Sequence, residues 1–336
     1  MRNKFAILLF SLMGLITNAC GQGSNEIKDA IKNLTNSETK ENSLIFLSQL
    51  IRENPEKLAT FSREIGKILN KELKDSEFDF GLTSLALELY QNKLLVLGVD
   101  TEKNLVEKHQ QMRSRLKQGA NYHNWIWNNE EYLDVRTNSG LLLDLFGYGQ
   151  TDESKNELVN SISFFSDTRL KYFALASAHK RGHQIETKDV QEIAAEDETR
   201  GLIYDYLKST GNLNLFPNKF NNQTDLSKSD MVNWLIFPTE LARVPTKIEL
   251  IKVFTIEYDD VGPADFYLWK FMADDDTWKD EGWMVGLSGA FIRSETPTMD
   301  SYGYTFSAFT KLEEKTPEDH FEYIIGIMED WNSQND

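Results

Sequence analysis

Cysteine is almost absent from the sequence: Cys20 is the only one among 336 residues. A single cysteine forms no disulfide within its own chain and cannot build a multi-cysteine zinc site, so a disulfide-stapled fold and a zinc finger are both excluded. Histidine is also scarce, with five residues. The one pair at helical spacing, His179 and His183, encloses Lys180 and Arg181, which repel a cation. We therefore expect no zinc site.

Basic residues are in short supply as well. The chain has 36 Lys and Arg against 53 Asp and Glu, a formal net charge of −17. Nucleic-acid binding and electrostatic adhesion to anionic lipid both depend on clustered Lys and Arg, so we expect no nucleic-acid partner. Hydrophobic residues make up 40% and aromatic residues 12% of the chain, which is enough for a packed core and argues against global disorder. The length leaves room for two domains.

No apolar run is long enough for a membrane-spanning helix, which needs roughly 20 residues. The strongest run is Phe5 to Ile16, twelve residues that follow the basic residues Arg2 and Lys4. A short basic stretch followed by a short apolar stretch is typical of a secretory signal peptide. The sequence therefore predicts a signal peptide over residues 1–19.

Cys20 follows directly after this segment, in the stretch Thr17-Asn18-Ala19-Cys20-Gly21. The stretch resembles the lipobox of bacterial lipoproteins, although Thr17 stands where that motif usually has Leu. The resemblance implies that Cys20 is lipidated and becomes the mature N-terminus, anchored to a membrane of the bacterial cell envelope, with the outer membrane favoured. Each buried CH₂ of an acyl chain contributes about 0.8 kcal/mol to anchoring. The alternative is ordinary secretion with a chance cysteine.

Helical patterning dominates from residue 26 to about residue 209. Leu82, Leu85, Ala86, Leu89 and Tyr90, for example, follow the i, i+3, i+4 spacing of a one-sided apolar helix. We expect residues 20–40 to be a flexible tether, residues 41–210 to be a helical repeat array, and residues 211–230 to be a linker.

The segment Leu141 to Gly182 contains helix-like stretches separated by short turns, and Asp167-Thr168-Arg169 opens the last of them. It resembles a HEAT-like α-solenoid, in which an Asp and an Arg near a helix start recur. The resemblance implies stacked helix pairs and a surface for a protein partner. The alternative is an irregular helical array, because the sequence shows no strict period.

Strand-like alternation begins only in the last third, and we assign residues 231–336 to a small α+β domain. Strands are predicted over Ile248–Glu257, Asp265–Met272, Trp283–Ile292 and Ser301–Phe309, in an antiparallel sheet. Gly286 and Gly289, inside the third of these strands, indicate a bulge or a close approach of two backbones. The sequence from Thr316 predicts a closing helix, since Thr-Pro-Glu-Asp is a strong helix start. Loose helical repeats followed by this aromatic module resemble uncharacterised bacterial HEAT-repeat proteins.

Candidate sites for chemistry are weak. Asp274, Asp276 and Asp280 lie in an acidic loop that could hold calcium, but the spacing does not match an EF-hand loop, and a solvated loop is the simpler interpretation. Ser288 between two glycines lacks the spacing of a nucleophile elbow. No catalytic residue and no cofactor is predicted.

The aromatic side chains of the last domain are the remaining candidates for binding. Tyr267, Trp269, Trp278 and Trp283 could form stacking platforms for carbohydrate or cell-wall glycan, provided that at least two of them share an open face. The favoured hypothesis is a non-enzymatic, membrane-anchored envelope lipoprotein that acts as a scaffold for an unidentified protein partner. A glycan-binding module is the alternative, and an enzyme comes third.

Overall fold

The computed structural model describes residues 23–75, 77–116, 130–236, 240–259, 262–273, 280–293 and 306–333. The chain forms two compact units, which divide between Ile185 and Glu186. Unit 1 holds the helices from α2 to α10, and unit 2 holds the later helices together with the sheet.

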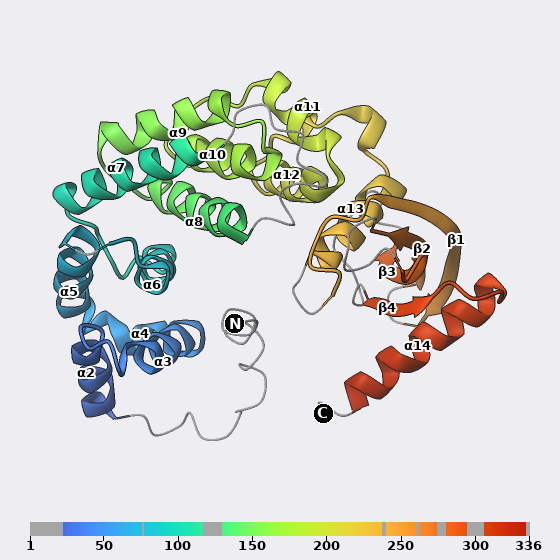
Figure 1. Ribbon diagram of the computed structural model, residues 1–336, viewed down its shortest axis with the longest axis horizontal. Helices are drawn as coiled ribbons and strands as arrows, with labels where there is room; N and C mark the ends of the chain where they lie inside the picture. The colour runs from blue at the N-terminus through green and yellow to red at the C-terminus, as the bar shows by residue number, and fades with distance from the viewer. Residues whose placement is uncertain are drawn as a thin grey trace. The chain divides into compact units, whose positions relative to one another are not determined.

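The described part of unit 1 is entirely helical. Its elements are α2 (Ser24–Asn33), α3 (Lys40–Glu53), α4 (Pro55–Ala59), α5 (Ser62–Asp75), α6 (Phe80–Gln91), α7 (Val99–Arg115), α8 (Glu130–Phe146), α9 (Asp152–Phe164) and α10 (Thr168–Lys180). Helices α2, α5, α7 and α9 contact one another in series and form one row (Figure 1). The second row contains α3, α6, α8 and α10, and each packs against its partner in the first row. Two stacked rows of this kind are the arrangement of an α-solenoid.

Side chains at the helix starts explain where several of these helices begin. Asp79 accepts a hydrogen bond from the backbone N–H of Leu82 at the start of α6, and Thr151 and Asp167 cap α9 and α10 in the same way. Such caps satisfy backbone N–H groups that have no partner inside the helix. The predicted apolar face of α6 is confirmed, because its five residues are buried.

The predicted flexible tether over residues 20–40 needs correction. Residues 24–33 form helix α2, whose Ile27 and Ile31 are 3% and 0% exposed. The segment is polar in composition and looks like a linker. Its few apolar residues nevertheless fall on one face, which α3 and α5 cover.

Unit 2 combines helices with a four-stranded sheet, which confirms the predicted α+β fold class for the C-terminal part. Its elements are α11 (Thr187–Ala195), α12 (Asp197–Ser209), η3 (Leu213–Leu215), η4 (Asn218–Phe220), α13 (Gln223–Leu235), β1 (Lys247–Tyr258), β2 (Gly262–Met272), β3 (Met284–Ile292), β4 (Phe306–Lys311) and α14 (Pro317–Ser333). The sheet is antiparallel, with strand order β1-β2-β3-β4.

The segment 211–230, interpreted from sequence as a linker, instead contains two short 3₁₀ turns and the first half of α13. Its asparagines serve as local caps: Asn222 accepts from the backbone N–H of Asp225 at the start of α13. The division between the two units therefore lies earlier in the chain than the composition suggested, ahead of α11.

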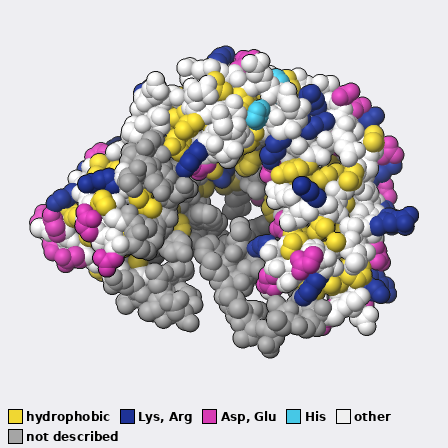
Figure 2. Space-filling model, turned by 180° about the vertical axis from the view of Figure 1, so that it is seen from behind, with side chains coloured by type: hydrophobic (Ala, Val, Ile, Leu, Met, Phe, Trp, Pro, Cys, Tyr) yellow, Lys and Arg dark blue, Asp and Glu magenta, His cyan; other side chains and the backbone are white. Residues whose placement is uncertain are grey.

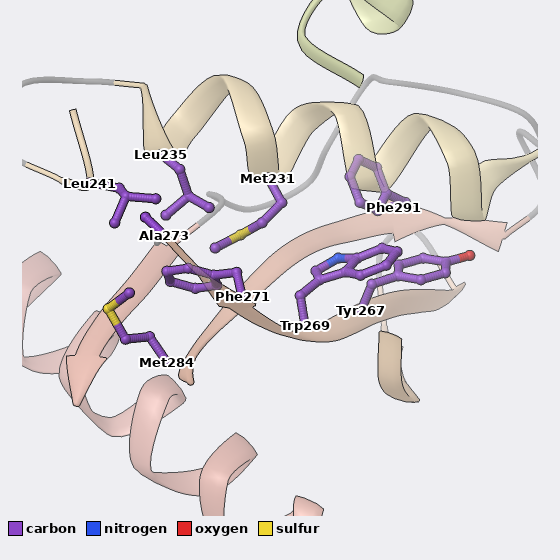
Figure 3. Close-up of a cluster of buried hydrophobic side chains, with 9 residues drawn as sticks. All are labelled: Met231, Leu235, Leu241, Tyr267, Trp269, Phe271, Ala273, Met284 and Phe291. Carbon is purple, nitrogen blue, oxygen red and sulfur yellow. The ribbon is translucent and has the colours of Figure 1, made fainter. Parts of the chain in front are cut away.

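A layer of apolar side chains covers each face of the sheet. On one face, Met231 and Leu235 of α13 pack against Trp269, Phe271 and other β-strand residues (Figure 3). On the other face, Ile324 of α14 packs against a second set of strand residues.

The close approach of two backbones predicted for the glycines of β3 is confirmed at Gly289, whereas at Gly286 the close neighbour is a side chain. A Cβ on Gly289 would lie 2.7 Å from the carbonyl oxygen of Asp265, and a Cβ on Gly286 would lie 2.1 Å from Cε of Met231. Gly289 also has a φ of +125°, which residues with a Cβ rarely adopt.

Among the helices that the structure describes, none is long and apolar enough to cross a membrane. Charges of both signs are interspersed on the face shown in Figure 2. The excess of acidic residues is thus not concentrated in a single patch on that face.

Candidate functional site

Two of the four aromatic candidates for glycan stacking are buried. Tyr267 is 5% exposed and Trp269 is 2% exposed, and both belong to the apolar layer beneath α13 (Figure 3). Their polar atoms are satisfied within the protein, since the Tyr267 hydroxyl donates to Oε1 of Gln223 and Nε1 of Trp269 donates to Oγ of Ser288. These two residues are therefore structural, which corrects their assignment as stacking platforms.

Trp283 is half-buried, and the ammonium group of Lys270 lies 4.4 Å from its ring centroid. Trp278, like Cys20, lies outside the residues that the structure describes. Among the three aromatic candidates that the structure describes, therefore, no two share an open face.

The acidic loop is described only in part. Asp274 and Asp276 fall outside the described residues, while Asp280 is exposed. No group of three or more acidic, histidine or cysteine side chains that could hold a metal occurs in the part of the chain that the structure describes.

The structure brings three distant polar residues together between α7, α8 and α9. Nδ1 of His109 lies 2.7 Å from Oε1 of Glu157, and Nε2 of the same ring lies 2.8 Å from Oγ of Ser139. The exposed fractions of the three side chains are 0% for His109 and Ser139 and 1% for Glu157. We call these three residues the buried triad.

Helix geometry and apolar packing hold the buried triad in place. His109 follows the buried Leu105 by one helical turn on α7, and Glu157 precedes the buried Leu158 on α9. The imidazole ring meets the ring of Phe146 edge-on, with centroids 5.8 Å apart. The ring is thus fixed by aromatic contact as well as by its two hydrogen bonds.

The Glu157 carboxylate has two further partners besides His109. Nε2 of Gln110 donates to Oε2 over 3.2 Å, and Nε of Arg113 lies 3.4 Å from Oε1. Arg113 in turn lies over the ring of Phe164, 5.0 Å from its centroid. A buried carboxylate is tolerable only with such partners, because burial without them costs several kcal/mol.

Burial is the main cause that lowers the pKa of His109 below its usual value of 6.5. The hydrogen bond to Glu157 acts in the opposite direction, and the charge of Arg113 lowers the pKa further. The neutral ring matches the geometry: Nδ1–H donates to the carboxylate, while Nε2 accepts from the Ser139 hydroxyl.

A second buried carboxylate lies two helical turns earlier on α7. Glu102, 1% exposed, accepts from the backbone N–H groups of Gln150 and Thr151 and from the Ser154 hydroxyl. Burial alone raises the pKa of Glu102, but these hydrogen bonds outweigh it and leave the pKa below its usual value. Arg181 closes the group by donating to the Thr151 carbonyl over 2.8 Å. The result ties α7 to the turn before α9.

A buried ion pair joins α8 to α10. Nε and Nη2 of Arg136 donate to the two carboxylate oxygens of Asp167 over 2.6 and 3.1 Å. Asp167 also caps α10. A similar, more exposed arrangement links Lys40 of α3 to Asp79, the cap of α6. An aspartate cap that pairs with a cation on an earlier helix therefore occurs at both α6 and α10.

The hydrogen bonds of the buried triad run from a serine to a histidine to a carboxylate, which is the arrangement of a nucleophile, a general base and an orienting acid in serine hydrolases. A hydrolase needs the nucleophilic oxygen to reach a substrate carbonyl, and Ser139 is fully buried. In this conformation the triad is therefore a polar clamp that fixes α7, α8 and α9 to one another.

Sequence reasoning missed the triad because its members are 48, 30 and 18 residues apart (109 to 157, 109 to 139, 139 to 157) and match no motif. Helical periodicity was the one feature of the sequence that could have pointed to these residues. His109 and Glu157 each occupy a position on the buried face of an amphipathic helix, where a polar residue needs a partner.

Comparisons with known proteins give no match of any kind. No family model matches the chain, and neither a curated protein nor a solved structure matches it.

Proposed function

We propose that this chain is a non-enzymatic, lipid-anchored scaffold of the bacterial cell envelope, most simply of the outer membrane, whose helical array binds another protein. The proposal joins two parts. Cys20, at the end of the signal-peptide-like stretch, provides the anchor, and unit 1 provides the binding surface.

The observation that carries the scaffold role is the two-row packing of unit 1. Each row turns an outer surface to solvent, for example through Glu131, Asp134 and Thr137 on α8 and through Glu153 and Asn156 on α9. Buried polar groups fix the helices behind these surfaces, so their spacing is rigid. Stacked helix pairs most often use such extended surfaces to bind partners.

An enzymatic role has less support, because the nucleophile–base–acid arrangement found in the described residues is closed to solvent. A glycan-binding role has less support as well, because Tyr267 and Trp269 lie in the core. Neither replaces the scaffold as the leading function.

The anchor is tested with the Cys20→Ser variant. Metabolic labelling with a fatty acid should modify the wild-type protein, and the variant should be unlabelled and released from the membrane fraction. An unlabelled wild-type protein would rule out the lipid anchor.

The binding surface is tested by placing a photo-crosslinking amino acid at Thr137 on one row or at Asn156 on the other, in cells that keep the full-length protein. We expect one of the two positions to give a discrete adduct and the other to give none. If Thr137 is the reactive position, reversing the charge of its exposed neighbour with Asp134→Lys should abolish the adduct. Diffuse or equal crosslinking from both rows would contradict a specific binding surface.

A further inference from the structure

The first helix of the array begins very close to the lipidated position. Helix α2 starts at Ser24, and Cys20 precedes it by four residues. An extended chain spans at most about 3.6 Å per residue, so Cys20 and Ser24 are separated by no more than about 14 Å. That distance is smaller than the thickness of the headgroup and interfacial layers plus the diameter of one helix. The connection is therefore too short to hold α2 well away from the membrane surface.

Helix α2 does not unwind cheaply to lengthen this connection. Its Ile27, Ala30 and Ile31 are 3%, 8% and 0% exposed, and the helix packs against α3 and α5. Fully burying an isoleucine side chain contributes about 1.5–3 kcal/mol. Melting α2 would give up two such contributions, from Ile27 and Ile31.

The outer surface of α2 is compatible with a membrane. The exposed charges on α2 are Glu26, Asp29, Lys28 and Lys32, two acidic and two basic, so the helix carries no net charge. The whole chain carries −17. A neutral surface at this end avoids the repulsion that an acidic surface would meet at anionic headgroups.

We propose that the lipid headgroup layer is itself a contact partner of this protein and that the exposed face of α2 lies against it. The inference rests on the proposed lipid anchor at Cys20. Unit 1 is then held with α2 as its membrane-proximal helix, and α9, three helices further along the same row, lies away from the membrane. Neighbouring helix axes are 8–10 Å apart, so α9 lies roughly 27 Å beyond α2.

The test uses the acylated full-length protein in vesicles whose lipids carry a contact quencher on the headgroup. Because the chain has no cysteine besides Cys20, which acylation blocks, a fluorophore can be attached to Lys28→Cys on α2 or to Asn156→Cys on α9. Both positions are exposed. A third protein carries Lys28→Cys and an insertion of about 20 Gly and Ser residues between Gly23 and Ser24, a flexible chain that spans about 25 Å. Acylation of Cys20 is measured on every sample.

We expect quenching at position 28 to be several-fold stronger than at position 156, and we expect the insertion to remove that difference. Equal quenching at the two positions in protein with confirmed acylation would overturn the inference and leave the scaffold role intact. Undiminished quenching after the insertion would also overturn it, because contact would then not depend on the short connection. A lack of acylation would instead overturn the proposed anchor itself.

Discussion

His109 and Glu157 are 48 residues apart in the chain, yet Nδ1 of the first lies 2.7 Å from Oε1 of the second, with both side chains sealed from solvent. The contact joins α7 to α9, two neighbours in one row of unit 1. Because the ring also accepts from Ser139 of α8, a single imidazole connects both rows of the array.

The first prediction concerns the loss of stability at acidic pH. The pKa of His109 is lower in the folded chain than its usual 6.5, so the unfolded chain binds an additional proton as the pH falls below that value. The stability that depends on the neutral ring is present above pH 6.5 and is lost as the pH falls toward the pKa of the folded state. The free energy of unfolding should therefore decrease below pH 6.5 with a slope of up to about 1.4 kcal/mol per pH unit. Denaturant unfolding measured across this range checks it.

His109→Gln should flatten that slope, and His183→Gln, at a half-buried position near the end of α10, should leave it unchanged. An identical acid dependence in wild type and His109→Gln would show that other groups cause the loss.

The second prediction compares two aspartate caps. Asp167 is 2% exposed and pairs with Arg136, whereas Asp79 and its partner Lys40 keep 25% of their side-chain surface exposed. Asp167→Ala removes a cap and leaves the buried guanidinium of Arg136 without its carboxylate. It should lower the free energy of unfolding by about 3–5 kcal/mol. Asp79→Ala mainly removes a cap and should cost about 0.5–2 kcal/mol. Chemical denaturation of both variants decides the matter, and equal costs would mean that the Arg136–Asp167 pair adds nothing beyond the cap.

The third prediction concerns two glycines. A Cβ on Gly149 would lie 2.2 Å from Oε1 of Glu102, which is buried and held by hydrogen bonds, so Gly149→Ala should destabilise the protein by about 1–3 kcal/mol. Gly326 in α14 has nothing within 4 Å of such an atom, so Gly326→Ala should stabilise its helix by about 0.5–1 kcal/mol. Thermal melting of the two variants should shift in opposite directions. An unchanged melting temperature for Gly149→Ala would show that the Glu102 side chain can move aside without loss of stability.

The fourth prediction concerns the reactivity of Ser139. Because its hydroxyl is fully buried, the native protein should resist a fluorophosphonate serine probe. Labelling is read by mass spectrometry, with Ser163 on the exposed face of α9 as the reference for unactivated hydroxyls. Rapid labelling that Ser139→Ala abolishes would point to a conformation in which the buried triad opens and acts as a nucleophile.

Local rules in the sequence determined much of the fold. Three signals each depend on residues a few positions apart, so the elements themselves were predictable: the helix start at Thr316, the alternation in Ile248–Glu257 and the apolar face beginning at Leu82. The α+β class followed from the order of those elements. Gly289 of β3 was also informative, because a Cβ at that position would lie 2.7 Å from the backbone oxygen of Asp265 on the neighbouring strand.

The tertiary structure alone decided which polar residues meet and which aromatic residues are buried. Alternation places Tyr267 and Trp269 on one face of a strand but does not say whether a helix covers that face, and α13 does. Likewise, the polar stretch from Ser24 to Asn33 became a helix because α3 and α5 bury its few apolar side chains. His109, Ser139 and Glu157 form one cluster only because three helices stack, since burial of a polar side chain requires a partner and the chain supplies it from a distance.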